Sequence, residues 1–236
     1  MDRVFSFIDL RAFAASALAD GAASGTWTNG RKALDLAPGP VTLSALRLAP
    51  GEGQSPAQAG DEFVLVLSGS LALVAGGTAV TLGADDSAVV PRGQAVSWSA
   101  PSGATLLIMG CAEEGGPGAD RVVAIDTGVA LTPSGAPLAE LLLSPTPACR
   151  NHTTYVSGSG TFMCGVWDST PYHRRAMYYR HFELMLLLDG SVTFVDEAGR
   201  EGTFNKGDIF LVEQAATCSW ESRVDVAKIY AIYRPA

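Results

Sequence analysis

Charged residues are scarce in this chain of 236 residues, and basic residues are the scarcer kind. Only 17% of the residues are charged, and 16 Lys and Arg against 24 Asp and Glu give a formal net charge of -8. A negative field of this kind repels phosphate backbones and anionic membrane surfaces. We therefore expect neither nucleic acid nor a membrane among the partners of this protein.

Long apolar runs and cysteine motifs are missing as well. No run approaches the roughly 20 apolar residues that a membrane-spanning helix needs. The cysteines are scattered and form no CxxC pair; they are Cys111, Cys149, Cys164 and Cys218. This pattern favours reduced thiols over a disulfide framework or a cysteine-type zinc site, so we expect a cytoplasmic protein.

What the sequence does contain is typical of an all-β protein. Hydrophobic residues make up 47% of the chain, and 26 Gly and 13 Pro supply many turns. Runs of four to eight apolar residues end at Gly, Pro or Asp, as in EFVLVLSG and ELMLLLDG. Such runs predict short antiparallel strands joined by hairpins. One short helix is expected over residues 10–18, behind the N-cap residue Asp9.

The chain repeats itself. The stretch APGPVTLSALRLAPGEGQSPAQAGDEFVLVLSGSL aligns without a gap with GSGTFMCGVWDSTPYHRRAMYYRHFELMLLLDGSV, and Glu62 meets Glu183 as Gly69 meets Gly190. A tandem duplication follows, with each copy a closed or double-sheet barrel of jelly-roll type. The acidic, glycine-rich segment 112–120 reads as a linker, so we predict domains at 1–111 and 121–236.

Both copies resemble the cupin family. Glu62 to Gly69 and Glu183 to Gly190 each fit a glutamate, six residues and a glycine, while DSAVVPRG and GDIFLVEQA resemble the second cupin motif. The second copy is similar to ethanolamine-utilisation cupins and to (S)-ureidoglycine aminohydrolase. The residues that carry this similarity are Gly207, Asp208, Trp220, Glu221 and Lys228. The resemblance implies two tandem cupin barrels of the RmlC-like jelly-roll type, packed as a pseudo-dimer within one chain, from which homo-oligomers are also possible.

The histidines that hold a divalent metal in typical cupins are largely replaced here. In the first copy the equivalent positions are Ser55, Pro56, Ala57, Gln58 and Val96, and in the second they are Ala176, Met177, Tyr178, Tyr179 and Cys218. We therefore expect no metal cofactor of the usual kind. If a metal binds, its ligands would be His181, Glu183 and Cys218.

The best polar cluster lies in the second copy. Because alternate residues of a strand share a face, Tyr179, His181 and Glu183 should all point into the barrel. His181 and Glu183 are candidates for an acid/base pair or for metal ligands. The alternative is a buried polar network that serves the structure alone.

Trp220, Lys228 and Tyr230 are the candidate ligand-binding residues on the last two strands. A buried ammonium needs an anionic partner, so Lys228 should meet either Glu183 or the carboxylate of a ligand. Arg175, in the basic segment with His173 and Arg174, belongs to a solvated loop or clamps a carboxylate at the barrel mouth. The first copy, which keeps Glu62, should be structural.

Three functions remain open at this stage. The preferred hypothesis is a bicupin whose second barrel binds a small, anionic metabolite. The alternatives are a metal-dependent hydrolase or aminohydrolase and a non-catalytic regulatory or assembly protein. The fold alone does not choose among them.

Overall fold

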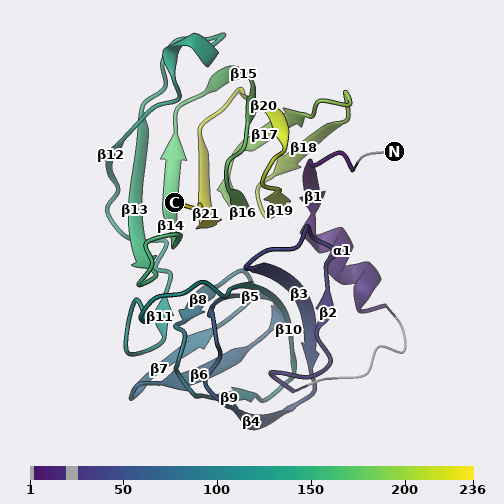
Figure 1. Ribbon diagram of the computed structural model, residues 1–236, viewed down its shortest axis with the longest axis vertical. Coiled ribbons are helices and arrows are strands. Elements are labelled where there is room, and N and C mark those ends of the chain that lie inside the picture. The colour runs from purple at the N-terminus through teal and green to yellow at the C-terminus, as the bar shows by residue number, and fades with distance from the viewer. Residues whose placement is uncertain (1–2, 20–25) are drawn as a thin grey trace. The chain divides into compact units, whose positions relative to one another are not determined.

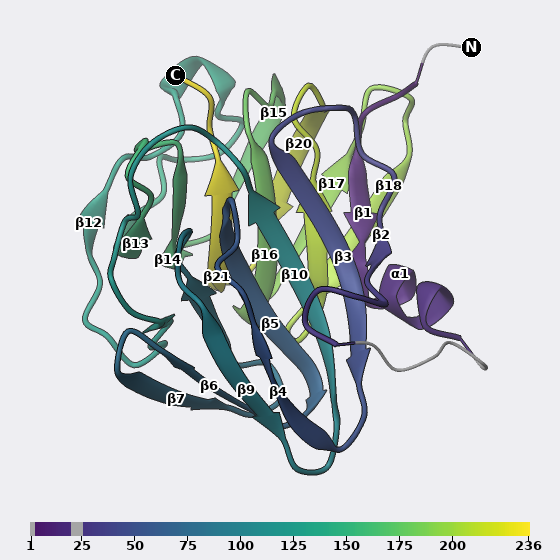
Figure 2. The ribbon, with the colours of Figure 1, turned by 60° about the horizontal axis from the view of Figure 1, so that its bottom comes forward.

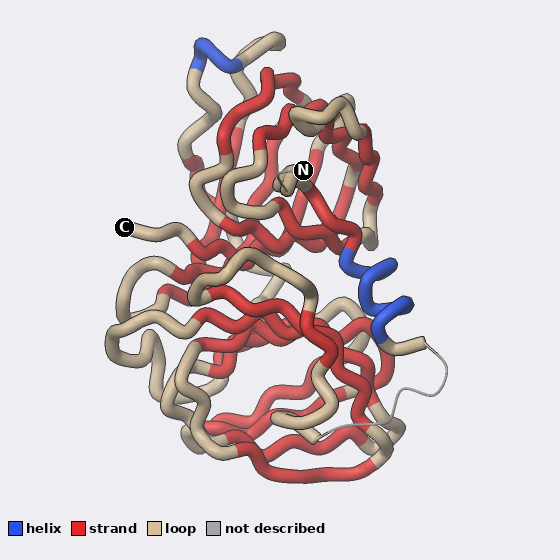
Figure 3. The backbone as a smooth tube through the Cα atoms, turned by 45° about the vertical axis from the view of Figure 1, so that its right-hand side comes forward, coloured by secondary structure: helices blue, strands red, loops and turns tan. Residues whose placement is uncertain are grey.

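The computed structural model describes residues 3–19 and 26–236, in which antiparallel strands carry the fold (Figure 3). Its described helices are α1 (Leu10–Ala17) and the 3-10 helix η1 (Ala139–Leu141). α1 lies where the sequence predicts a helix. Neither helix is long and apolar enough to cross a membrane, a finding that covers the described residues. The predicted all-β class is confirmed.

The first copy is built from a six-stranded sheet of order β11-β8-β5-β10-β3-β2 and a four-stranded sheet of order β4-β9-β6-β7. Figure 2 shows β3, β10 and β5 side by side. The strands are β2 (Lys32–Ala33), β3 (Val41–Leu48), β4 (Gly51–Ser55), β5 (Asp61–Gly69), β6 (Leu71–Ala75), β7 (Thr78–Leu82), β8 (Ser87–Val90), β9 (Val96–Ala100), β10 (Ala104–Cys111) and β11 (Val123–Ala124).

The second copy repeats this plan with a seven-stranded sheet of order β1-β19-β16-β21-β14-β13-β12 and a four-stranded sheet of order β15-β20-β17-β18 (Figure 1). The strands are β1 (Phe7–Asp9), β12 (Thr132–Ser134), β13 (Cys149–Val156), β14 (Phe162–Ser169), β15 (Tyr172–Tyr178), β16 (Phe182–Asp189), β17 (Ser191–Val195), β18 (Glu201–Asn205), β19 (Ile209–Val212), β20 (Thr217–Ser222) and β21 (Val226–Tyr233).

Each of the two compact units of the chain includes a short segment from the other copy's part of the sequence. The first-copy unit consists of Leu10–Ile125 together with Thr154–Cys164, and the second-copy unit holds the rest of the chain, including the residues up to Asp9. β1 accordingly pairs with β19, with Phe7 opposite Val212. The glycine-rich segment 112–120 that the sequence predicts as a linker lies within the first-copy unit.

The central strand β16 shows why these sequences form barrels. Glu183, Met185 and Leu187 share one face of it, and Met185 and Leu187 belong to the hydrophobic core of the second copy. Leu184 and Leu186, between them, are buried on the opposite face. A strand buried on both faces reads as a continuous apolar run, which is the pattern ELMLLLDG.

Gly190 closes the hairpin after β16 in a conformation that other residues rarely adopt. Its φ is +76°, and an added Cβ would lie 2.0 Å from the backbone oxygen of Asp225. Gly69, its counterpart in the first copy, has a φ of +82° and would place a Cβ 2.1 Å from the oxygen of Gly103. Both copies therefore keep a glycine at this turn, where the backbone of another segment lies too close for a side chain.

Gly190→Ala is expected to lower the free energy of unfolding by about 3 kcal/mol or more, because left-handed strain is added to a backbone clash. Gly199→Ala is the matched control, since Gly199 has a φ of +79° and nothing within 4 Å of its added Cβ. Gly199→Ala should lower the free energy of unfolding by only about 1–2 kcal/mol. Urea denaturation of both proteins measures the difference, and equal losses would show that the close approach to Asp225 is relaxed at little cost.

Candidate functional site

The carboxylate of Glu183 is the centre of the buried polar group in the second copy. Lys228 Nζ donates a hydrogen bond of 2.8 Å to its Oε1, and Oε2 lies 3.3 Å from His181 Nε2. All three residues are buried. They come together because Glu183 lies on β16 and Lys228 on the adjacent strand β21, where it is opposite Leu187.

Aromatic rings surround the ammonium of Lys228. Its Nζ lies 4.7 Å from the ring centre of Trp167 and 5.2 Å from that of Trp220. Trp220 in turn stacks on Tyr172, with ring centres 5.4 Å apart and planes 8° apart. Cations over aromatic faces are stabilised most when water is excluded, as it is here. This group, Trp167, Tyr172 and Trp220, is called the aromatic cage below.

A buried arginine extends the polar group on the side of β15. Arg174 is 4% exposed, and its Nη2 donates a hydrogen bond of 2.5 Å to the hydroxyl of Tyr179. Its Nη1 donates to the backbone oxygens of Cys218 and Arg175. The ring of Tyr179 lies 5.2 Å from that of His181. A row of contacts thus runs from Arg174 through Tyr179 and His181 to Glu183.

The charges along this row are set by opposing effects. Burial alone would raise the pKa of Glu183, but the ammonium of Lys228 and the hydrogen bond from His181 outweigh it and hold that pKa well below its usual range. Burial raises the pKa of Tyr179 by more than the charge of Arg174 lowers it. Glu183 is therefore ionised and Tyr179 is neutral, so the hydrogen-bond partners of the guanidinium of Arg174 are all uncharged.

The structure places the other predicted site residues outside this row. The hydroxyl of Tyr230 is 2.8 Å from Thr153 Oγ1. Arg175 is exposed, but the predicted loop around it is the strand β15, in which Arg175 points away from the side of the buried Arg174. Cys218 is fully buried, and burial, followed by the charge of Asp196, raises its pKa to about 11. Its thiol is therefore protonated at neutral pH and is a poor nucleophile.

Sequence reasoning missed three residues of the site. Arg174 lies two residues after the buried Tyr172, so the alternation along β15 turns Arg174 inward and Arg175 outward. Because the segment is predicted as a loop, this alternation is not applied to it. Trp167 and Tyr172 belong to the stretch GVWDSTPYHRR, where the alternation around Trp167 is the one signal of an inward-facing aromatic. No spacing rule connects them to Lys228.

The donor set does not fit the divalent metal that typical cupins hold. Within residues 3–19 and 26–236, no three His, Cys, Asp or Glu side chains gather in a way that could hold a metal ion. Glu183, which occupies the position of the cupin glutamate ligand, is bound to an ammonium instead. Only His181 stands beside it as a further donor.

The equivalent glutamate of the first copy is closed off by neighbouring side chains. Glu62 accepts a hydrogen bond of 3.0 Å from the indole of Trp27 and one of 2.7 Å from Arg31. Trp27 is fully buried in the core cluster of that barrel, together with Trp98, and Arg31 lies over the face of its ring. The position that holds a metal ligand in typical cupins is thus occupied here by a glutamate bound to the protein's own tryptophan and arginine.

Comparisons with known proteins agree with this architecture. Residues 45–109 match the model of the cupin domain and residues 156–230 match that of the EutQ-like cupin domain. No protein of curated function matches the chain.

Solved structures match along the whole chain. A protein of unknown function of the DUF861 family from Pseudomonas syringae is 28% identical, with a TM-score of 0.84 over 98% of this chain and 100% of that one. Protein YlbA from E. coli, also of the DUF861 family, is 12% identical, with a TM-score of 0.57 over 99% and 93%. A salicylate 1,2-dioxygenase from Pseudaminobacter salicylatoxidans is 15% identical, with a TM-score of 0.59 over 98% and 84%. The last two similarities show the fold alone. With two cupin domains in tandem, the chain is a bicupin of the cupin superfamily.

Proposed function

We propose that the second copy binds a small organic anion between Arg174 and the aromatic cage, without a metal ion. The observation that carries this proposal is the buried guanidinium of Arg174, whose hydrogen bonds all go to uncharged groups. Arginine keeps its positive charge in proteins, and an unpaired buried charge is costly. An anionic ligand removes that cost.

A count of charges supports an anion rather than a neutral molecule. Arg174 and Lys228 are the two buried cations near Glu183, whose negative charge Lys228 already neutralises. The other buried carboxylates of this copy, Asp196 and Glu213, are paired with Arg200 and Arg3. Arg174 therefore remains without a carboxylate among the described ion pairs. The planar fork of a guanidinium matches the two oxygens of a carboxylate, which makes a carboxylic acid the natural ligand class.

The aromatic cage supports a ligand with an apolar body. Trp167 and Trp220 lie against the ammonium of Lys228, and Tyr172 stacks on Trp220 behind it. Such rings favour a small molecule whose carbon skeleton packs against them while its charged end meets a cation. Among the residues that the structure describes, no third His, Cys, Asp or Glu joins His181 and Glu183 in a way that could hold a metal ion, so no observation favours the metal-dependent hydrolase.

Carboxylates of this class are expected to stabilise the protein against heat. A ligand at 100 times its dissociation constant adds about 2.7 kcal/mol to the free energy of unfolding. The experiment is a thermal-shift series with acetate, pyruvate, malonate and benzoate, with chloride at equal ionic strength as the reference. Arg174→Met should abolish the carboxylate-specific shift, whereas Arg175→Met, which removes an exposed arginine one residue away, should keep it.

Two controls make this result decisive. Arg174→Lys keeps the charge without the fork and should retain a reduced shift. Circular dichroism of Arg174→Met in the absence of ligand shows whether the barrel is folded. The proposal is wrong if no carboxylate exceeds chloride, or if folded Arg174→Met responds as strongly as Arg175→Met.

A further inference from the structure

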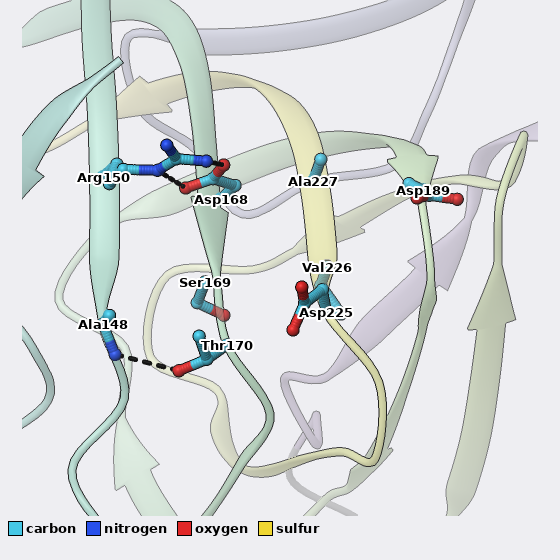
Figure 4. A pocket seen from close by; sticks show the side chains of 9 residues that line it. All are labelled: Ala148, Arg150, Asp168, Ser169, Thr170, Asp189, Asp225, Val226 and Ala227. Carbon is cyan, nitrogen blue, oxygen red and sulfur yellow. Dashed lines mark hydrogen bonds and ion pairs between the residues drawn. The ribbon is translucent and has the colours of Figure 1, made fainter.

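A separate groove lies at the ends of β14 and β16 in the second-copy unit. Its volume is about 450 Å³, and its lining includes Arg150, Asp168, Ser169, Asp189 and Asp225 (Figure 4). This volume is within the range of about 300–1,000 Å³ that small-molecule sites occupy. None of these residues takes part in the site around Glu183 and Arg174.

The groove carries more negative charge than its one arginine neutralises. Arg150 is engaged with Asp168 in a two-point ion pair of 3.0 and 2.5 Å. Asp189 has Lys206 at 3.8 Å, but both side chains are about 70% exposed, so this pair is screened by water. Figure 4 shows Asp225 and Asp189 on the side of the groove away from the Arg150–Asp168 pair. Their carboxylates are available to a cation.

A buried hydroxyl without a partner lies among these charges. Ser169 is 3% exposed, and its Oγ has no hydrogen-bond partner among residues 3–19 and 26–236. Its neighbour Thr170 is satisfied, since Thr170 Oγ1 accepts a hydrogen bond from the backbone N–H of Ala148. Figure 4 shows the Ser169 oxygen turned toward Asp225. Buried polar groups usually have a partner, so this one points to a hydrogen-bonding group that the protein does not supply.

The first copy provides an internal comparison. A groove of about 350 Å³ occupies the equivalent place there, lined by Arg47, Ser68 and Gly103 at the positions that match Asp168, Asp189 and Asp225 in the repeat. Its lining includes no carboxylate. The groove itself is thus a property of the fold, whereas its negative charge is a property of the second copy.

We propose that the acidic groove of the second copy binds a short alkyl diamine through its primary ammonium groups. An ammonium has three donors, which suit the carboxylate of Asp225 and the hydroxyl of Ser169 together. Asp189 receives the other charged end. A bare divalent cation is a poorer match, because the described part of the chain gathers no three carboxylate, histidine or cysteine ligands that could hold one.

The test is isothermal titration of the full chain with putrescine at low ionic strength. Saturable binding is expected, and the double variant Asp189→Asn/Asp225→Asn should weaken it at least about tenfold, since hydrogen bonds to charged groups are lost. Ser169→Ala should weaken it about threefold to tenfold. The matched control is Glu114→Gln/Asp120→Asn, which removes the same charge from exposed positions in the other unit and should leave the affinity within about twofold.

Three outcomes would overturn the proposal. These are the absence of a saturable signal, an equal loss in the control pair, and full affinity in the Asp189→Asn/Asp225→Asn protein. The first would show that the groove takes no diamine, and the other two would reduce the effect to the general attraction of an acidic protein for cations. Thermal unfolding of each variant confirms that it is folded. None of these substitutions touches Arg174, so the carboxylate experiment is independent of this one.

Discussion

Replacing Lys228 with methionine is expected to lower the free energy of unfolding by about 3–5 kcal/mol, because it leaves the buried carboxylate of Glu183 without its ammonium. Only His181 would remain beside that carboxylate. Urea denaturation followed by circular dichroism measures the loss. The effect should shrink in acid: the depressed pKa of Glu183 contributes stability above the ordinary glutamate value of 4.5 and loses it as the pH falls further.

The partner substitution separates the charge from the packing of Lys228. In Glu183→Gln/Lys228→Met the buried charge is gone while the amide still reaches His181, so most of the lost stability should return. A double variant as unstable as Lys228→Met would assign the loss to the contacts of the lysine with Trp167 and Trp220 instead.

Trp27→Ala is expected to cost about 3–5 kcal/mol in the first-copy unit. The indole is fully buried among the barrel side chains, and its removal opens a cavity and takes one hydrogen bond from the buried Glu62. Urea denaturation again gives the magnitude.

A conservative variant and a surface variant serve as controls for Trp27→Ala. Trp27→Phe keeps most of the volume and loses the N–H donor, so an intermediate loss is expected. Val74→Ala, at a position that is 44% exposed in the same unit, should change the stability by less than about 0.5 kcal/mol. If Trp27→Ala costs no more than Val74→Ala, the indole does not hold the interior of the first barrel.

The fold could be predicted from the sequence because its signals are local and occur twice. Apolar runs bounded by Gly and Asp predict β5 and β16, and their counterparts appear in the structure as Asp61–Gly69 and Phe182–Asp189. The duplication then fixes the remaining strands by analogy. The membership of β1 in the second copy could not be predicted in this way, since Phe7 and its partner Val212 are far apart in the sequence and no local signal connects them.

The site could be predicted only in part, for a related reason. A buried lysine must meet an anion, and Glu183 was one of two partners that this rule allows for Lys228. The choice between Arg174 and Arg175 depends on whether their segment is a strand, since alternation with the buried Tyr172 then turns Arg174 inward. The sequence predicts a loop there, and a loop carries no such alternation. Trp27 has no counterpart in the repeat, so nothing in the sequence connects it with Glu62.

The pairing of β1 with β19 also affects when the second barrel can be completed during translation. β1 (Phe7–Asp9) is translated long before its partner β19 (Ile209–Val212). At the usual rate of about 5–20 residues per second, β1 remains without its partner for roughly 10–40 s. The first-copy unit is likewise incomplete until Cys164 has emerged. The sheet of the second barrel therefore lacks its edge strand pairing until β19 has been synthesised, although β1 has been available since early in translation.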